Sequence, residues 1–272
     1  MKVIAAVNGS VVSQMSAKYA LEYANVLHYD LVLLYIKNKK DPMEDVNETF
    51  ETLSLEGSKI GVNIETVILK GDPHKAIKDY LLNTNADTLF CSTRRGKDYF
   101  TNSFSERLSK AKLPVNLAVV RVVHLAQNNS FESIILPIKE SKLSVKKFTF
   151  FSVMAKAFDA KTEVYSITTM SKNKMVHIDI KKAKEMLAFI NSNLRHYVQL
   201  SKILGFHLTI KHEFTLNEEN TILEHIARSN HQLAIIGAKR LSFFSRFLGK
   251  EPIEKLLQNS SINTIAFYPQ EE

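Results

Sequence analysis

One pattern of alternating apolar strands and amphipathic helices occurs twice in the chain, and this repeat constrains the fold more than any other feature. The run KVIAAV (2–7) is matched by SIILPI (133–138), and the segments that follow match in the same order, about 130 residues apart. Each strand-like run is almost continuously apolar, as is typical of parallel strands buried on both faces of a sheet. A repeat of this length indicates a duplicated domain rather than a solenoid unit.

In each half the expected elements follow the order β-α-β-α-β-α-β-α-β. We expect strands at 2–7, 30–36, 62–69, 87–92, 115–123, 133–138, 162–168, 206–214, 233–238 and 262–269. We expect helices at 13–28, 42–60, 71–86, 103–111, 144–160, 181–204, 220–230 and 250–259. In the third of these helices, Asp72 fits the N-cap and Pro73 the first turn.

Strands that alternate with helices in this way predict an α/β fold. We expect two tandem Rossmann-like domains, each a five-stranded, mostly parallel sheet with helices on both faces. The predicted domains are residues 1–123 and 132–272, and residues 124–131 form the predicted linker.

Composition limits the classes of function. The 272 residues are 45% hydrophobic, which is enough to bury two cores, and no run reaches the roughly 18 apolar residues of a membrane span. The single cysteine, Cys91, excludes a disulfide framework and favours a cytoplasmic protein. The net charge of +8 suits a polyanionic partner, but the dispersed Lys and Arg argue against nucleic acid. No Cys/His spacing predicts a metal site.

Segments at four places of the family pattern, the first of them in both halves, are together similar to the tandem, two-domain form of the universal stress protein family, over nearly the whole chain. IAAVNGS and ILPIKES lie where the family has a strand ending in a Pro-x-Asp-x-Ser turn, and GDPHKAI matches its Gly-x-Pro turn. AIIGAKR and SFSERLSKAKLPVNLAVV match the later strand, helix and last strand. The resemblance implies an adenine nucleotide alpha hydrolase-like fold and ATP or AMP as ligand. It also implies an intramolecular pseudo-dimer in which the last strands of the two halves meet.

Nucleotide binders of the family carry Gly-x-x-Gly, nine further residues, and then Gly-Ser or Gly-Thr. The glycines let backbone N–H groups approach the phosphates closely. In the first half Cys91 and Arg94 take the first two glycine positions, and Asn102 and Ser103 take the last pair. Asn8 holds the position of the family's aspartate at the end of the first strand.

The second half departs from the motif differently. Gly237 and Gly249 are kept, but Arg240 takes the position of the middle glycine. Lys139 replaces the aspartate and inverts its charge, while Pro137 is kept and the Gly-x-Pro turn is absent.

Two interpretations of these departures stay open. In one, cationic side chains bind the phosphate in place of glycine N–H groups: Arg94, Arg95 and Lys97, or Lys239, Arg240 and Lys250. In the other, slightly favoured, these side chains fill the old phosphate position. The candidate nucleotide- or phosphate-binding residues are Ala6, Asn8, Ser10, Gly71, Arg94, Gly96, Asn102, Ser103, Pro137, Gly237, Arg240, Gly249 and Lys250.

Other reactive side chains have simpler explanations. His74 fits a solvated first-turn residue better than a ligand, and Cys91 fits a buried strand end better than a reactive thiol. Ser103, Ser105 and Glu106 fit a capped helix start. The phenylalanines fit core or interface positions: Phe148, Phe150, Phe151, Phe243, Phe244 and Phe247.

The sequence gives little support for catalysis. It contains neither a Gly-x-Ser-x-Gly elbow nor a Gly-x-x-x-x-Gly-Lys-Ser/Thr loop, so we predict no enzyme, with weak ATPase activity left open. The expected function is a cytoplasmic, universal stress protein-like regulatory or protective module with altered or lost nucleotide binding. It would act through protein partners, and a homodimer is left open. The alternative is an ATP- or AMP-binding stress sensor that uses mainly the N-terminal half.

Overall fold

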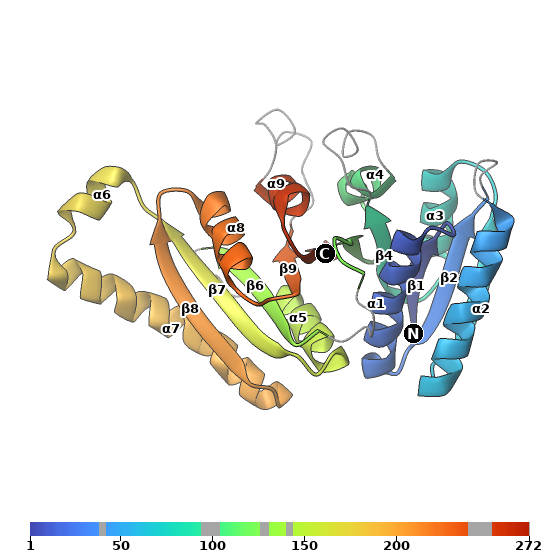
Figure 1. The fold of residues 1–272 in the computed structure, drawn as a ribbon, viewed down its shortest axis with the longest axis horizontal. Helices are drawn as coiled ribbons and strands as arrows, with labels where there is room; N and C mark the ends of the chain where they lie inside the picture. Colours follow the sequence, from blue (N-terminus) through green and yellow to red (C-terminus); the bar gives the residue numbers. More distant parts are fainter. Residues whose placement is uncertain (38–41, 94–103, 126–130, 140–143, 239–251, 272) are drawn as a thin grey trace.

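Ten strands form one continuous sheet in the computed structural model, which describes residues 1–37, 42–93, 104–125, 131–139, 144–238 and 252–271 (Figure 1). The strand order is β3-β2-β1-β4-β5-β10-β9-β6-β7-β8. The first half contributes β1 (Lys2–Val7), β2 (Asp30–Ile36), β3 (Ile64–Leu69), β4 (Ala86–Thr93) and β5 (Asn116–Arg121). The second contributes β6 (Ser133–Lys139), β7 (Lys161–Thr169), β8 (Leu208–Thr215), β9 (Leu233–Gly237) and β10 (Asn263–Tyr268). The predicted tandem α/β fold is confirmed.

The two halves join where their last strands meet. β5 and β10 run antiparallel, with Arg121 opposite Thr264 and Leu117 opposite Tyr268. The neighbours on either side of this pair are parallel. The last strand of each half is therefore covered by the other, as the predicted pseudo-dimer requires, and neither apolar strand is left as an open edge. The exact bounds of the two domains and the linker stay a prediction.

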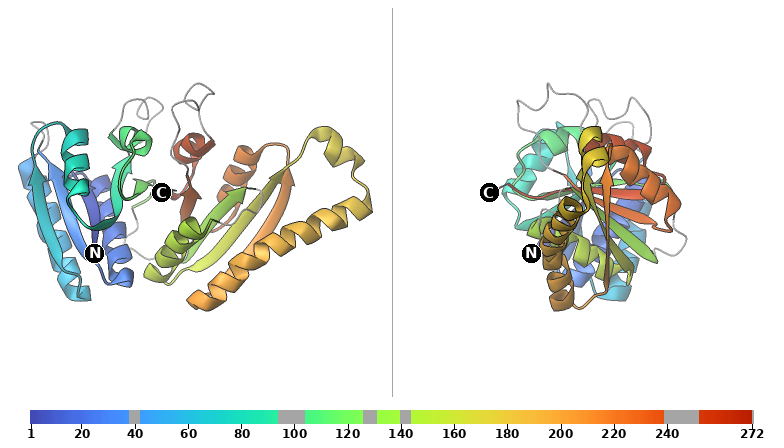
Figure 2. Two further views of the ribbon diagram at one scale, coloured as in Figure 1. Left: turned by 180° about the vertical axis from the view of Figure 1, so that it is seen from behind. Right: turned by 90° about the vertical axis from the view of Figure 1, so that its left-hand side faces the viewer.

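Helices cover both faces of the sheet (Figures 1 and 2). One face carries α1 (Val11–Leu27), α2 (Met43–Ile60), α5 (Val145–Ala157) and α7 (Ile180–Leu204). The other carries α3 (Pro73–Leu82), α4 (Phe104–Lys110), α8 (Glu218–Arg228) and α9 (Pro252–Asn259). This layering explains the continuous apolar runs in the sequence, because the inner strands are buried on both sides.

An aromatic cluster ties the two halves together beneath α1 and α5. Phe150 of α5 stacks on Phe267 of β10 with ring centroids 4.1 Å apart, and it also contacts Tyr23 of α1 at 5.2 Å. Phe148 and Phe151 are buried in the same core. The predicted core role of these three phenylalanines is confirmed, while Phe243, Phe244 and Phe247 lie outside the described residues.

The second half is not an exact copy of the first. A short helix, α6 (Lys172–His177), precedes α7 and was not predicted. α7 has 25 residues, whereas its counterpart α2 has 18. Figure 1 shows α6 and the start of α7 extending beyond the edge of the sheet. Across the described ranges, no helix is long and apolar enough to cross a membrane.

Candidate functional site

The candidate site lies at the carboxyl ends of the parallel strands, where open α/β sheets bind ligands. In the first half, Ala6 lies near the end of β1, Asn8 and Ser10 follow that strand, and Gly71 follows β3. In the second, Pro137 lies near the end of β6 and Gly237 ends β9. The other candidates fall outside the described residues: Arg94, Arg95, Gly96, Lys97, Asn102, Ser103, Lys239, Arg240, Gly249 and Lys250.

The Asn8 side chain is used by its own turn. Its Oδ1 accepts hydrogen bonds from the Ser10 backbone N at 3.2 Å and from Ser10 Oγ at 2.7 Å. Ser10 in turn is the N-cap of α1, where its Oγ accepts from the Ser13 N–H. Asn8 therefore uses its side-chain oxygen to stabilise the turn into α1.

Gly9, which follows Asn8, lets the start of α2 approach this turn closely. Its φ is +80°, and an added Cβ would lie 2.8 Å from Asp45 Cβ and 3.0 Å from the Asp45 carbonyl carbon. A positive φ and a backbone neighbour at that distance both exclude a side chain. The turn after β1 is thus covered by the chain's own helix.

Asp72 caps α3, as the sequence predicts. Its Oδ1 accepts from the backbone N–H groups of His74 and Lys75, and these bonds lower the pKa of its carboxyl group. His74 lies beside Phe104 of α4, with ring centroids 5.4 Å apart. Burial, with the Arg107 charge, lowers the pKa of His74. His74 therefore packs between two helices of the first half.

Cys91 is buried in the core beneath α3 and α4. Burial raises the pKa of its thiol to about 12. The reading of Cys91 as a buried strand-end residue agrees with this environment. The registers of β1 with β4 and of β6 with β9 make Ser92, rather than Cys91, the counterpart of Gly237. The motif alignment between the halves is therefore shifted by one residue at this strand.

α4 begins at Phe104, so Ser105 and Glu106 lie in its first turn and Glu106 takes the third helical position, where the glutamate of a capping box lies. The N-cap position, Ser103, is outside the described residues, so the capped start stays a prediction. Glu106 also forms an ion pair with Lys110 one turn later.

In the second half, Lys147 covers the retained glycine. A Cβ added at Gly237 would lie 2.4 Å from Cδ and 3.2 Å from Nζ of Lys147, so the lysine stem passes directly over this backbone. Lys139, at the family's aspartate position, forms an ion pair with Glu218 of α8 at 2.9 Å. Both cations at this strand edge therefore interact with groups of their own chain.

A cavity of about 320 Å³ opens beside this glycine. It is lined by the N-terminal residues of α5, by Ala238 and by the residues after β10, among them Gln270. Lys146 Nζ donates a hydrogen bond across its rim to the Gln270 carbonyl oxygen at 3.1 Å. The cavity is large enough for a small ligand.

The structure also brings together three side chains that no motif predicted. Glu163 of β7, His225 of α8 and His231 before β9 converge within 4.8 Å, at the opposite end of the second-half strands. No sequence pattern connects them, because the glutamate lies 62 residues before the first histidine.

Comparison with known proteins shows the fold. No family model matches the chain, and no curated protein sequence matches it. A universal stress protein from Archaeoglobus fulgidus is similar in structure, with a TM-score of 0.65 and 14% identity over 99% of this chain and 98% of that one. A protein of unknown function from Pseudomonas aeruginosa has a TM-score of 0.62 and 13% identity over 99% and 92%.

The cytoplasmic domain of a prokaryotic cation chloride cotransporter also has this fold. Its TM-score is 0.58 and its identity 12%, over 100% of this chain and 96% of that one. These likenesses extend along both halves, so the predicted fold of the tandem universal stress proteins is confirmed.

Proposed function

We propose that this chain, which has the fold of the tandem universal stress proteins, is a member of that family with altered or lost nucleotide binding that acts through a protein partner. In this proposal it is a cytoplasmic regulatory or protective module and not an enzyme. The observation that carries the proposal is the path of Lys147 over Gly237. A phosphate would need that backbone surface, and here a side chain of the protein covers it.

The neighbouring contacts support the same interpretation. Lys139 is paired with Glu218 and Asn8 with Ser10, so two positions that would face a nucleotide are used within the chain. A cation that already pairs with a carboxylate has less to gain from binding a phosphate. The cotransporter domain shows that the fold also occurs as a part of larger proteins.

The projecting segment of the second half supports action through a partner. We call residues 172–189, which comprise α6 and the start of α7, the α6–α7 arm. Its apolar side chains Val176, Ile180 and Phe189 are 70%, 77% and 68% exposed. The arm also carries the lysines Lys172, Lys174, Lys181, Lys182 and Lys184 against Asp179 and Glu185. Like charges would oppose pairing of two such arms, so we propose an acidic protein surface as the partner.

The proposal predicts that the purified protein carries no nucleotide. The chain has no Trp and nine Tyr, so its absorbance at 280 nm is weak and a bound nucleotide would raise the 260/280 ratio plainly. We expect a ratio typical of protein and no change in the unfolding temperature with millimolar ATP or AMP. A clear thermal shift with either nucleotide would contradict lost binding.

The alternative is an ATP- or AMP-binding sensor in the first half. It is favoured by the open surface at Gly71, where φ is +105° and no described atom lies within 4 Å of an added Cβ. In that case the thermal shift should appear in the wild type, persist in a Lys147→Ala variant and be lost in an Asn8→Ala variant. If a nucleotide shifts the unfolding temperature of Lys147→Ala but not of the wild type, then Lys147 is the group that blocks nucleotide binding in the second half.

The partner hypothesis has its own test. A poly-glutamate column at low salt should retain the protein, and charge reversal at Lys181 and Lys182 should release it at lower salt. If the variant is retained as strongly as the wild type, the hypothesis that the α6–α7 arm is the docking surface is contradicted. Salt-dependent binding to random DNA at the same ionic strength would instead indicate a nucleic-acid partner.

A further inference from the structure

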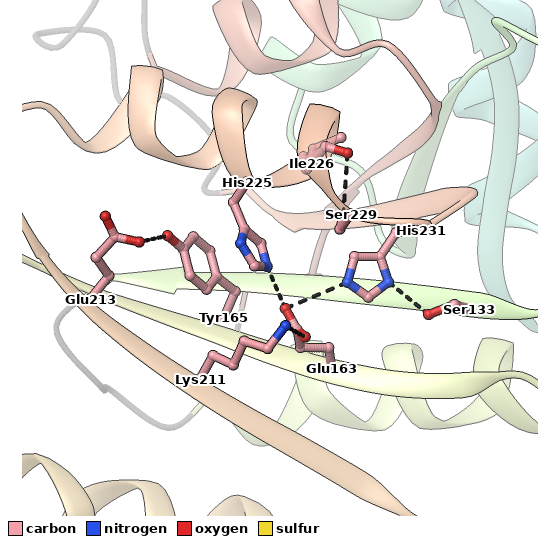
Figure 3. A network of polar contacts seen from close by, with 9 residues as sticks. All are labelled: Ser133, Glu163, Tyr165, Lys211, Glu213, His225, Ile226, Ser229 and His231. Carbon is pink, nitrogen blue, oxygen red and sulfur yellow. Dashed lines mark hydrogen bonds and ion pairs between the residues drawn. The ribbon is translucent and has the colours of Figure 1, made fainter.

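The second half contains a buried polar cluster at the end of the sheet away from the candidate nucleotide site (Figure 3). Glu163 is near the start of β7, His225 is in the last turn of α8, and His231 lies two residues before β9. The Glu163 side chain is only 6% exposed and that of His231 only 8%. A carboxylate buried this deeply needs compensating positive charge.

One carboxylate oxygen, Glu163 Oε1, faces both imidazoles. It lies 2.5 Å from His225 Nε2 and 3.4 Å from His231 Nε2. The other oxygen, Oε2, is 2.7 Å from Lys211 Nζ. The lysine thus occupies one side of the carboxylate, and the two histidine nitrogens converge on the other (Figure 3).

The orientation of His231 is fixed from its other nitrogen. Its Nδ1 lies 2.7 Å from Ser133 Oγ. Its buried Nε2 faces Glu163 Oε1 at 3.4 Å and makes no hydrogen bond of good geometry among the described residues. A second hydrogen bond of this kind is how metal-binding histidines are usually oriented, because it fixes the tautomer. When Nδ1 carries the proton, Nε2 presents a lone pair to the carboxylate, and the two repel unless a cation lies between them.

The His225 ring is held in place by stacking. It lies against the Tyr165 ring with centroids 3.8 Å apart and planes 10° apart, and Tyr165 Oη donates a hydrogen bond to Glu213. Figure 3 shows the imidazole edge directed from this stack toward Glu163. Three ligand-type atoms from three separate elements are thus preset around one point.

We propose that Glu163 Oε1, His225 Nε2 and His231 Nε2 bind one divalent transition-metal ion of the zinc class. Two imidazoles and a carboxylate form a frequent ligand set for zinc, with water in the fourth position. Tetrahedral bonds of about 2.0–2.1 Å place ligand atoms about 3.3 Å apart, which fits the 3.4 Å separation at His231. At His225 the metal replaces the 2.5 Å hydrogen bond, so that imidazole moves back by nearly 1 Å.

The site would join elements that are distant in the chain. The ligands connect β7, α8 and the start of β9, and Ser133 adds the start of β6. An ion that binds only the folded arrangement stabilises it in proportion to its concentration above the dissociation constant. The three ligand residues take no part in the proposed loss of nucleotide binding, so the metal site can exist whether or not a nucleotide binds.

The test is a titration of the full-length, tag-free chain with Zn²⁺ or Co²⁺ after dialysis against chelator. We expect one equivalent to bind, a rise in the unfolding temperature, and the visible absorption of tetrahedral Co²⁺. His225→Gln and His231→Gln should each weaken binding by about 100-fold or more. Ser133→Ala should weaken it by roughly 10-fold, since second-sphere changes typically cost 10–100-fold.

Matched variants separate this site from adventitious binding. His212→Gln changes another histidine of the second half, which hydrogen-bonds to Ser166 rather than to Glu163, and it should leave affinity unchanged. Cys91→Ser should also leave it unchanged. Lys211→Met should strengthen binding, because it removes a positive charge beside the ligand carboxylate.

Three results would overturn the proposal. The first is no saturable binding, which would make the cluster a network of ion pairs only. The second is equal affinity for the wild type and His231→Gln. The third is a loss with His212→Gln as large as that with His231→Gln. If the ligand variants fail to fold, histidine NMR signals of the wild type decide, since Zn²⁺ should shift those of His225 and His231 and not those of His212.

Discussion

At the residue scale, Gly9 shows how one missing side chain permits the architecture around the first-half site. Both its positive φ and its contact with the Asp45 backbone depend on the absence of Cβ. Gly61 has a similar φ of +76°, but no described atom lies within 4 Å of an added Cβ. The two glycines therefore share a left-handed backbone, but only Gly9 is crowded by a neighbouring helix.

We predict that Gly9→Ala destabilises the protein more than Gly61→Ala. Each substitution places a side chain in the left-handed region, at a cost of about 1–2 kcal/mol. Gly9→Ala adds a clash with the start of α2, worth roughly 1–3 kcal/mol more. Denaturant unfolding of both variants measures the difference, and equal losses would show that α2 does not press on this turn.

Cys91 should be unreactive while the protein is folded. Burial raises its pKa to about 12, and the thiolate is the reactive species. We expect no reaction with a thiol reagent at pH 8 in native conditions and one thiol per chain after unfolding. Rapid labelling of the native protein would contradict the burial.

The same burial predicts a dependence of stability on pH. The thiol ionises only in the unfolded chain between its ordinary pKa near 8.5 and the folded value of about 12. Its contribution is therefore complete below about pH 8.5 and is lost as pH rises above that. The free energy of unfolding should fall more steeply from pH 8.5 to 10 in the wild type than in Cys91→Ala.

At the element scale, the strands and long helices were predictable because their burial imposes a period on the sequence. The apolar run DLVLLYI became β2 with five consecutive buried residues, and the antiparallel meeting of β5 with β10 followed from the family resemblance. α6 was missed because none of its residues is buried, so it has no apolar stripe. The Glu163 cluster was missed because only the fold brings its distant members together.

The long helix α7 should tolerate change on its exposed surface and not on its buried one. Phe189 is 68% exposed, whereas Leu194, five positions later, is 4% exposed. We predict that Phe189→Ser changes the free energy of unfolding by less than about 0.5 kcal/mol, while Leu194→Ala lowers it by about 2–4 kcal/mol. A large loss with Phe189→Ser would mean that this side chain is covered within the chain.

The same two variants also test whether the α6–α7 arm is a docking surface. If the α6–α7 arm binds a partner, Phe189→Ser should weaken that binding without weakening the fold. Leu194→Ala should weaken the fold but leave partner binding unchanged, measured at a temperature where this variant remains folded.

At the scale of the whole molecule, the halves are joined by more than strand pairing. Asn263, at the start of β10, is 2% exposed and uses both ends of its amide. Its Oδ1 accepts from the backbone N–H groups of Val123 and His124, and its Nδ2 donates to Tyr19 Oη and to the His124 carbonyl. One side chain of the second half thus hydrogen-bonds both to α1 and to the segment after β5, which belong to the first half.

This joint predicts that the chain unfolds as one unit. Asn263→Ala removes the hydrogen bond to the buried Tyr19 hydroxyl and three bonds to the backbone of Val123 and His124. A buried polar group that loses its partner costs about 1–3 kcal/mol and each further hydrogen bond about 0.5–1.5 kcal/mol, so we expect a total loss of about 3 kcal/mol. The exposed Asn83, whose side chain donates to the Asp79 carbonyl, is the control and should cost less than about 1 kcal/mol as alanine. Circular dichroism should show a single transition in both variants.

Hydrogen exchange should report the same loss of protection in β1 and in β7, because a shared interface transmits the destabilisation to both halves. Two separate transitions, with only one moved by Asn263→Ala, would show that the halves fold independently and that the continuous sheet does not make them cooperative.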